Sequence, residues 1–394
     1  MRNLFDALYT EAEKETSLDM GFRGRPAIGS AVMSRVDNLS QAPWPDFFEK
    51  IKKDSGNGRD ARIFLCGSAF GGTGASGFPT LGRLISDRLE AKDMNCRSSV
   101  KLGGVLLLPY FDFTVPGDIQ NSEELYANPN DFLLNTEAAL RYYRDQARKT
   151  FDLIYLLGTP NPSSVEQFSL GKGEQCNPPH FIELYAALAV RHFLNLSPKG
   201  SKPESRGQAV VIKRKHSEKI GWDDLPEDVR AQLLQTTRFA AAWATDINQT
   251  LRDAHKDFES SVRLIPWMTE FFYHPLARKK DLPRLDQKIA SLSVITQWCE
   301  NYLQWLKGLH LSPDNRSTGV NLFNCNAFLD DRNKDKFRPE PAKLWELVGK
   351  EDESDTIARL KSKYLSPGVL KTDPKSGLVG VARSLYVISR QEWR

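Results

Sequence analysis

The chain has 394 residues, of which 40% are hydrophobic and 26% charged, a composition that excludes wholesale disorder. The net charge of +4 is too small to indicate nucleic-acid binding, because only a clustered basic face would do so. The five cysteines form no CxxC pair and the six histidines no metal-ligand spacing, so we expect reduced thiols and no metal site. No apolar run approaches the roughly 20 residues of a membrane span, and the first residues lack a signal core. We therefore expect a cytoplasmic protein.

The first sixty residues predict short helices and one loop. Apolar positions recur at helical spacing over 1–16, and Pro43–Lys53 has a proline at the start of a second helix. Between them, Asp19–Gly29 is rich in glycine and arginine and is predicted as a loop. Arg23 and Arg25 could bind an anion there or lie solvated, as loop arginines usually do.

Apolar runs and helical periods then alternate along the chain. Continuous apolar runs predict buried strands, and periodic stretches predict helices. The expected strands are Ala61–Cys66, Gly104–Phe113 and Phe151–Gly158, and the expected helices are Leu81–Leu89, Asp131–Lys149 and Pro179–Leu196. This alternation predicts an α/β fold with a mainly parallel sheet. The last of these helices is apolar enough to be buried on most sides.

The composition changes after residue 196. Ser197–Gln208 is rich in proline, glycine and serine and predicts a linker, and Ala209–Ile212 predicts a short strand. Helices then dominate, at Leu225–Lys256 and Ile289–Leu306. The second carries an aromatic-rich stripe that we expect in a core, made of Ile295, Trp298, Tyr302 and Trp305. The predicted organisation is a helical and loop segment 1–60, an α/β core 61–196, a linker 197–221 and a helix-rich domain 222–394.

Residues 66–80, CGSAFGGTGASGFPT, place five glycines between the first strand and the helix that follows it. A glycine-rich turn in this position is typical of phosphate binding. No lysine or arginine lies between Arg62 and Arg83, which excludes a Walker loop. Gly72–Gly77 matches GxGxxG and Asp93 follows about 20 residues later, so an NAD(P)-binding Rossmann-type enzyme is one hypothesis. No apolar strand ends at Asp93, however, as that fold would require.

A second match to the glycine turn is closer. The stretch GGTGASG resembles the signature loop of the tubulin/FtsZ superfamily, and Phe70 and Ser76 are its two departures from the family pattern. The resemblance implies that backbone amides hold the nucleotide phosphates and that the threonine hydroxyl adds a donor. It therefore implies GTP or GDP, with Mg²⁺, as the cofactor. The residues that it assigns to the nucleotide site in this turn are Gly71, Gly72, Thr73, Gly74, Ala75, Ser76 and Gly77.

The order of elements after the turn also resembles that superfamily, in which a long central helix follows these strands. The resemblance implies base contacts from Asn161 and Asn177, although each precedes a proline and could equally start a turn. The family's first strand and first glycine loop have no counterpart before Ala61. The acidic loop that the family uses for hydrolysis is matched only distantly, because Glu183 stands one position late. Glu183 and His180 instead suit the first turn of a helix, where the helix dipole favours a carboxylate.

The leading hypothesis is a bacterial tubulin/FtsZ-like protein. It would bind a guanine nucleotide, possess at most a weak GTPase activity, and act through assembly with itself or with a partner protein. No catalytic residue is assigned. The NAD(P)-binding enzyme and a nucleotide-free scaffold are the alternatives.

Overall fold

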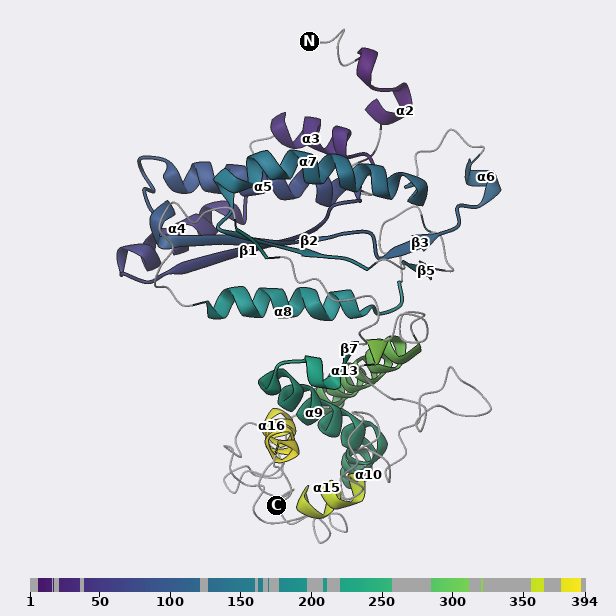
Figure 1. The fold of residues 1–394 in the computed structure, drawn as a ribbon. Coiled ribbons are helices and arrows are strands. Elements are labelled where there is room, and N and C mark those ends of the chain that lie inside the picture. Colours follow the sequence, from purple (N-terminus) through teal and green to yellow (C-terminus); the bar gives the residue numbers. More distant parts are fainter. Residues whose placement is uncertain are drawn as a thin grey trace. The chain divides into compact units, whose positions relative to one another are not determined.

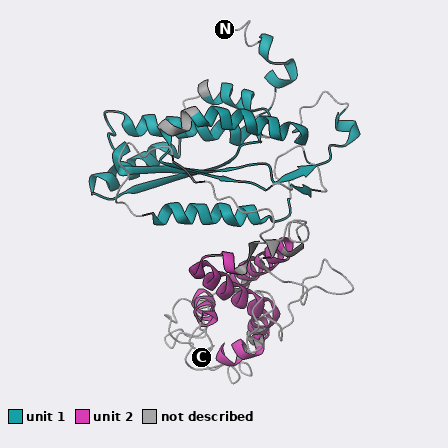
Figure 2. Ribbon diagram, viewed as in Figure 1, with its two compact units in different colours: residues 1–215 teal, residues 216–394 magenta. Residues whose placement is uncertain are grey.

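The computed structural model describes two compact parts of the chain. The described residues are 6–15, 17, 21–35, 39–120, 127–159, 162–165, 169, 177–196, 208–210, 220–256, 285–311, 320–321, 356–364 and 377–390. The chain divides into two compact units, residues 1–215 and 216–394 (Figure 2). The division falls inside the segment 197–221.

Unit 1 is built on a parallel sheet with the order β1-β2-β4-β6 (Figure 1). Its strands are β1 (Ala61–Ser68), β2 (Val100–Leu107), β4 (Leu153–Leu157) and β6 (Gln208–Val210). All three neighbouring pairs are parallel. The expected strand Gly104–Phe113 is interrupted at Pro109, whose missing N–H cannot continue the ladder. Its last part forms β3 (Phe111–Phe113), which pairs with β5 (Ser163–Val165) in a separate small sheet.

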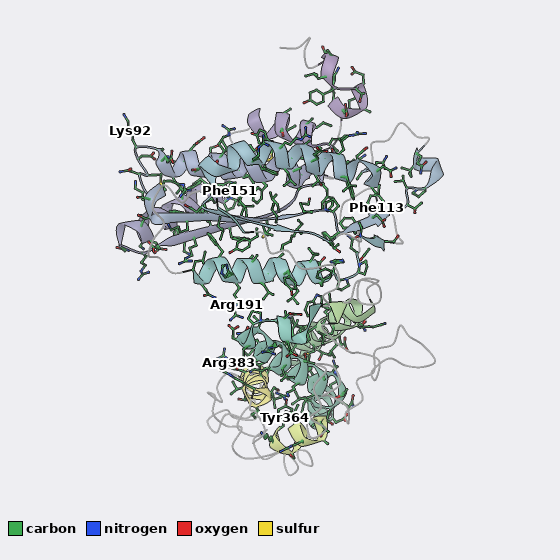
Figure 3. The ribbon with its side chains drawn as sticks, viewed as in Figure 1. Lys92, Phe113, Phe151, Arg191, Tyr364 and Arg383 are labelled. Carbon is green, nitrogen blue, oxygen red and sulfur yellow. The ribbon has the colours of Figure 1, made fainter. Side chains whose placement is uncertain are left out.

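Helices cover both faces of the main sheet, as a parallel sheet requires. α5 (Gly72–Glu90) and α7 (Phe132–Thr150) lie on one face, and α8 (Phe181–Asn195) lies on the other (Figure 1). On the α5 face, Phe151 stacks on Phe78 with 4.8 Å between the ring centroids (Figure 3 labels Phe151). On the other face, Phe193 of α8 packs against β2 and β4. Five residues of α8 are buried and Leu194 is 49% exposed, so the helix is not buried all round.

Further helices come from the N-terminal part of unit 1 and from the segment after β3. They are α2 (Glu11–Lys14), α3 (Pro26–Arg35) and α4 (Trp44–Gly56), with the short α6 (Gly117–Gln120) further along the chain. α3 packs against α5, and α4 packs against β1. α3 begins inside the expected loop Asp19–Gly29, because Pro26 has the fixed backbone angle that suits a first helical residue.

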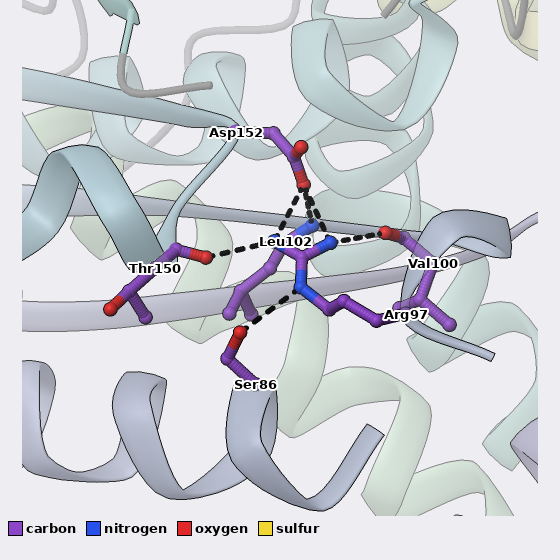
Figure 4. Close-up of polar contacts among 6 residues, drawn as sticks. All are labelled: Ser86, Arg97, Val100, Leu102, Thr150 and Asp152. Atoms are coloured by element: carbon purple, nitrogen blue, oxygen red, sulfur yellow. Dashed lines mark hydrogen bonds and ion pairs between the residues drawn. The ribbon is translucent and has the colours of Figure 1, made fainter. Parts of the chain in front are cut away.

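A buried arginine ties the amino ends of the strands together (Figure 4). Arg97 is 5% exposed and donates to the Ser86 hydroxyl of α5 at 3.1 Å. It also donates to the backbone carbonyls of Val100 and Thr150, each at 2.8 Å. Its guanidinium forms an ion pair with Asp152 at 3.3 Å, and that carboxylate accepts the Leu102 N–H at 2.7 Å. One side chain therefore joins α5, β2 and the end of α7.

The described residues of unit 2 are mainly helical. Its helices are α9 (Glu227–Ala242), a π-helical turn (Trp243–Ile247), α10 (Asn248–Lys256), α13 (Leu285–Leu311), α15 (Ile357–Tyr364) and α16 (Gly377–Ser389), with a short pair β7 (Ile220–Gly221) and β8 (Val320–Asn321). Trp243 is fully buried and donates its indole N–H to Thr296 at 3.1 Å. Tyr364, labelled in Figure 3, is buried and shares a 2.8 Å hydrogen bond with Ser389.

The sequence predicts that the aromatic-rich stripe of α13 lies in a core, but the structure buries a different stripe of this helix. Trp298 is 50% exposed and stacks on Tyr302, with 5.8 Å between centroids. The buried stripe is instead made of Leu292, Thr296, Cys299, Leu303 and Leu306. Both stripes follow the helical period. Thr296 of the buried stripe accepts the Trp243 indole N–H, and Tyr302 of the other shares a 3.0 Å hydrogen bond with Thr237 of α9.

Candidate functional site

The glycine turn lies at the carboxyl edge of the sheet. Ser68, Leu107 and Leu157 are aligned at the ends of β1, β2 and β4, so the turns that follow them meet at one edge. In open α/β sheets ligands bind at this edge. α5 begins here, and its first N–H groups have no acceptor within the helix. Gly71 is the N-cap and supplies no side-chain cap.

Two glycines of the turn are required by the protein's own packing. A Cβ on Gly72 would lie 2.7 Å from the carbonyl oxygen of Phe22 and 2.8 Å from the backbone nitrogen of Arg25. A Cβ on Gly74 would lie 2.5 Å from the carbonyl oxygen of Ser68. The close approach of protein backbone therefore explains both glycines without a ligand, and the number of glycines is not by itself an argument for phosphate binding.

The loop before α3 folds over the start of α5. Gly21 and Gly24 have φ values of 68° and 76°, and Arg23 between them has φ 39°, which gives the tight turn 21–25. The Phe22 N–H donates to the Thr73 hydroxyl oxygen at 3.3 Å. Asn135 of α7 donates its side-chain amide to the carbonyls of Gly24 at 3.2 Å and Phe70 at 3.5 Å. Three distant segments are thus joined at the beginning of α5.

Only part of the predicted turn reaches the surface. Thr73 is exposed, and Gly71 and Gly74 are half-buried. Ala75, Ser76 and Gly77 are buried, as is Gly72. The Ser76 hydroxyl donates to the Gly72 carbonyl at 2.7 Å and is therefore engaged within the helix. Thr73 is therefore the residue of this turn whose side-chain donor is exposed.

Turn 21–25 brings basic side chains that the sequence of the glycine turn lacks. The backbone nitrogen of Arg25 lies against Gly72, and the Nε atoms of Arg23 and Arg25 are buried. Arg25 Nε lies 3.7 Å from the carboxylate of Glu13, and the Arg25 side chain is 41% exposed. From the sequence, Arg23 and Arg25 are either solvated loop residues or anion ligands. The glycines on either side of Arg23 are the signal that this loop makes a tight turn.

Phe70, the family departure before the glycines, has a packing role. It is 4% exposed, and its ring contacts Tyr110, Phe111 and Phe132 at centroid distances of 6.2, 5.5 and 4.8 Å. Phe113, labelled in Figure 3, extends the same cluster through Phe132. An aromatic cluster therefore anchors the glycine turn to the connection after β2 and to the start of α7.

The start of α8 lies at the same cluster. His180 is the N-cap of α8, and its Nδ1 accepts the Ile182 N–H at 3.1 Å. The Glu183 carboxylate completes the capping box, which fits the structural role expected of both residues. Burial, and then the nearby Glu183, raises the pKa of Tyr110 to about 12. Asn177 is half-buried just before this helix, and Asn161 lies outside the described residues.

Asp93 lies at the opposite end of α5. A helix of 19 residues spans about 28 Å, so Asp93 cannot hold the ribose of a dinucleotide whose phosphates bind at Gly72. Asp93 instead accepts two 2.7 Å hydrogen bonds from Arg88. Both residues line a groove of about 510 Å³ between α4 and the end of α5. Asp93 therefore cannot be the ribose-binding acidic residue that the Rossmann hypothesis requires.

Within the part of the chain that the structure describes, no helix combines the length and the apolar character needed to cross a membrane. Comparisons of the chain with models of protein families, with curated proteins and with solved structures found no match.

Proposed function

We propose that unit 1 has a tubulin/FtsZ-like nucleotide-binding core that binds a guanine nucleotide through its phosphates at the start of α5. The protein then acts in the cytoplasm by assembling with itself or with a partner protein. The fold order supports this proposal: strand, glycine turn, helix, strand, helix, strand and long apolar helix follow one another, and the three strands are adjacent and parallel.

One observation carries the proposal. The first turn of α5 lies at the carboxyl edge of a parallel sheet, and the exposed Thr73 stands among amide groups that have no acceptor within the helix. An anion is favoured there by the amide donors and by the helix dipole together. Since Thr73 Oγ1 already accepts the Phe22 N–H, its own proton is available to donate to a phosphate oxygen.

Arg23 and Arg25 supply the positive charge in this proposal. The Arg25 backbone lies against Gly72 while its guanidinium lies 3.7 Å from the Glu13 carboxylate, so in this proposal a nucleotide phosphate takes the place of that carboxylate and gains charge-assisted hydrogen bonds. Bound Mg²⁺ would neutralise part of the phosphate charge. We expect slow hydrolysis at most, because the Glu183 carboxylate is engaged in the cap of α8. Preorganised charge usually supplies the largest share of such rate enhancement.

The test is to extract the nucleotide from natively purified protein and to measure GTP, GDP, NAD⁺ and inorganic phosphate binding by calorimetry. We expect GTP or GDP in the extract and affinity for both. Arg25→Gln should weaken this binding, while the matched variant Arg88→Gln, at the other end of α5, should not. Recovery of NAD(P) would favour the enzyme hypothesis. If no nucleotide is extracted and none of the four ligands binds, the nucleotide-free scaffold is the remaining hypothesis.

A further inference from the structure

Arg25 in turn 21–25 has a buried donor atom that the described part of the chain does not satisfy. Its Nε atom is buried and meets no hydrogen-bond acceptor among the described residues. The guanidinium is paired with the Glu13 carboxylate, but Oε1 of Glu13 lies 3.7 Å from Nε, which is too long for a hydrogen bond. A buried donor without an acceptor costs free energy, so an oxygen that approached Nε more closely would be favoured there.

The Glu13 carboxylate is shared between two tasks. Its second oxygen, Oε2, accepts the Thr10 N–H at 2.9 Å and the Thr10 hydroxyl at 3.2 Å. These contacts belong to the capping box at the start of α2. The carboxylate thus gives hydrogen bonding to the cap, and it attracts Arg25 by charge without completing a hydrogen bond to it.

Polar contacts attach α2 to the rest of unit 1. None of the four residues of α2 is buried, so apolar burial adds little to its attachment. Besides the pair of Glu13 with Arg25, the Tyr9 hydroxyl donates to the Ala27 carbonyl at 3.3 Å. In Figure 1, α2 lies outside the layers formed by the sheet and the helices that cover it. Exposed contacts of this kind contribute little free energy, and a segment held by them opens readily.

A phosphate group would make a stronger contact with Arg25 than Glu13 does. A guanidinium has five donors, and its pairs with phosphate are commonly bidentate and charge-assisted. The backbone of Arg25 lies against Gly72 at the start of α5, where the helix dipole favours the same anion. The contact between Glu13 and Arg25 is therefore one that an anionic ligand at α5 can break.

We propose that residues 6–15, which include α2, are an autoinhibitory strap: Glu13 competes with an anionic ligand for Arg25, and a bound phosphate displaces Glu13 and releases the strap. This inference rests on the proposed function, because it concerns the regulation of the same site. Such coupling is reciprocal. A change that removes Glu13 from Arg25 raises the affinity for the ligand, and a ligand bound at α5 exposes the N-terminal strap.

The first experiment compares two neutral variants of α2 in the full chain. Glu13→Gln removes the charge that faces Arg25, and glutamine still suits a capping box. Glu11→Gln is the matched control, because Glu11 pairs with Lys14 at 2.8 Å and its side chain is 84% exposed. Calorimetry with inorganic phosphate and with GTP should show about threefold tighter binding by Glu13→Gln, the equivalent of one surface ion pair, and no change for Glu11→Gln. Equal affinities of Glu13→Gln and the natural chain would overturn the proposal.

The second experiment measures release of the strap by trypsin cleavage after Lys14. This lysine is held within the strap by ion pairs with Asp6 at 2.9 Å and Glu11 at 2.8 Å. Saturating phosphate or GTP should speed the cleavage about threefold, because cleavage follows the population of the open segment. Glu13→Gln should speed it without any ligand. Cleavage after Lys50 of α4 is the internal control, and a ligand that leaves the rate at Lys14 unchanged would contradict the strap.

The two experiments together separate this inference from the proposed function. If the natural chain binds GTP, but Glu13→Gln binds it equally and the ligand does not alter cleavage, the nucleotide site stands and the strap is wrong. If neither the natural chain nor Glu13→Gln binds phosphate or GTP, both proposals are wrong.

Discussion

The Phe22 N–H donates a 3.3 Å hydrogen bond to the Thr73 hydroxyl oxygen across 51 residues of sequence. This bond fixes the loop before α3 on the first turn of α5. It leaves the hydroxyl proton of Thr73 as the side-chain donor at the exposed start of the helix. The same residue therefore holds the N-terminal turn and faces the proposed phosphate.

Thr73→Val should lower phosphate or nucleotide affinity by about tenfold, because a hydrogen bond to a charged group is worth about 1.5 kcal/mol or more. Thr73→Ser keeps the hydroxyl and should bind as the natural chain does. Thr80→Val is the matched control, since its hydroxyl donates within α5 to the Ser76 carbonyl at 2.8 Å. Calorimetry with GTP gives the three affinities, and equal losses at Thr73 and Thr80 would contradict the assignment.

Gly72→Ala should destabilise unit 1 by about 1–3 kcal/mol, the usual cost of forcing an extra group into a packed site. Its Cβ would lie 2.7 Å from the Phe22 carbonyl oxygen, so turn 21–25 must move. Gly56→Ala is the control, because nothing lies within 4 Å of its Cβ position. Urea unfolding measures the free energy of unfolding of both variants. Hydrogen exchange measures the protection of their 21–35 and α5 peptides. A stable Gly72→Ala with unchanged protection of 21–35 would show that this packing is incorrect.

Arg97→Ala should cost unit 1 about 3–5 kcal/mol, because it leaves the Asp152 carboxylate buried without its cation. The double variant Arg97→Met with Asp152→Asn should recover part of this loss, since no buried charge remains. Arg88→Ala breaks the solvent-exposed pair with Asp93 and should change the free energy of unfolding by less than about 1 kcal/mol. Similar losses for Arg97→Ala and Arg88→Ala would argue against a buried network.

The stability of unit 1 should fall above pH 10, the ordinary pKa of tyrosine. The folded state keeps Tyr110 protonated up to its pKa of about 12, while the unfolded state ionises near pH 10. The unfolded chain then binds fewer protons, so its free energy falls relative to the folded state as the pH rises. Tyr110→Phe should reduce this slope without abolishing it, because burial also raises the pKa of Tyr143 in the same unit. Urea unfolding between pH 8 and about 11.5 gives both slopes.

The main elements of unit 1 could be predicted because their signals are local. The apolar runs of β1 and β4 and the period of α7 depend on neighbouring residues alone, and the structure places each within a few residues of its predicted bounds. The cap at His180 and Glu183 has a local signal too. The parallel order follows from the alternation of strands and helices.

Other features depend on contacts between distant residues. α5 begins at Gly72, although glycine disfavours helices, because turn 21–25 and Ser68 pack closely against it. The stripe at Trp298 has the same period as the buried stripe of α13, and only the position of α9 decides between them. Arg23 and Arg25 lie near the glycine turn because the fold brings together two segments about 50 residues apart in the sequence.

Each unit has a core of its own, one built around Phe151 and the other around Trp243. We predict that each core melts as its own cooperative unit, so that heat produces two calorimetric peaks. A ligand at the start of α5 should then move only the peak of unit 1, by mass action on that unit's folded state. A single Tm would not describe this chain, and a scan with and without GTP would identify which peak belongs to which unit.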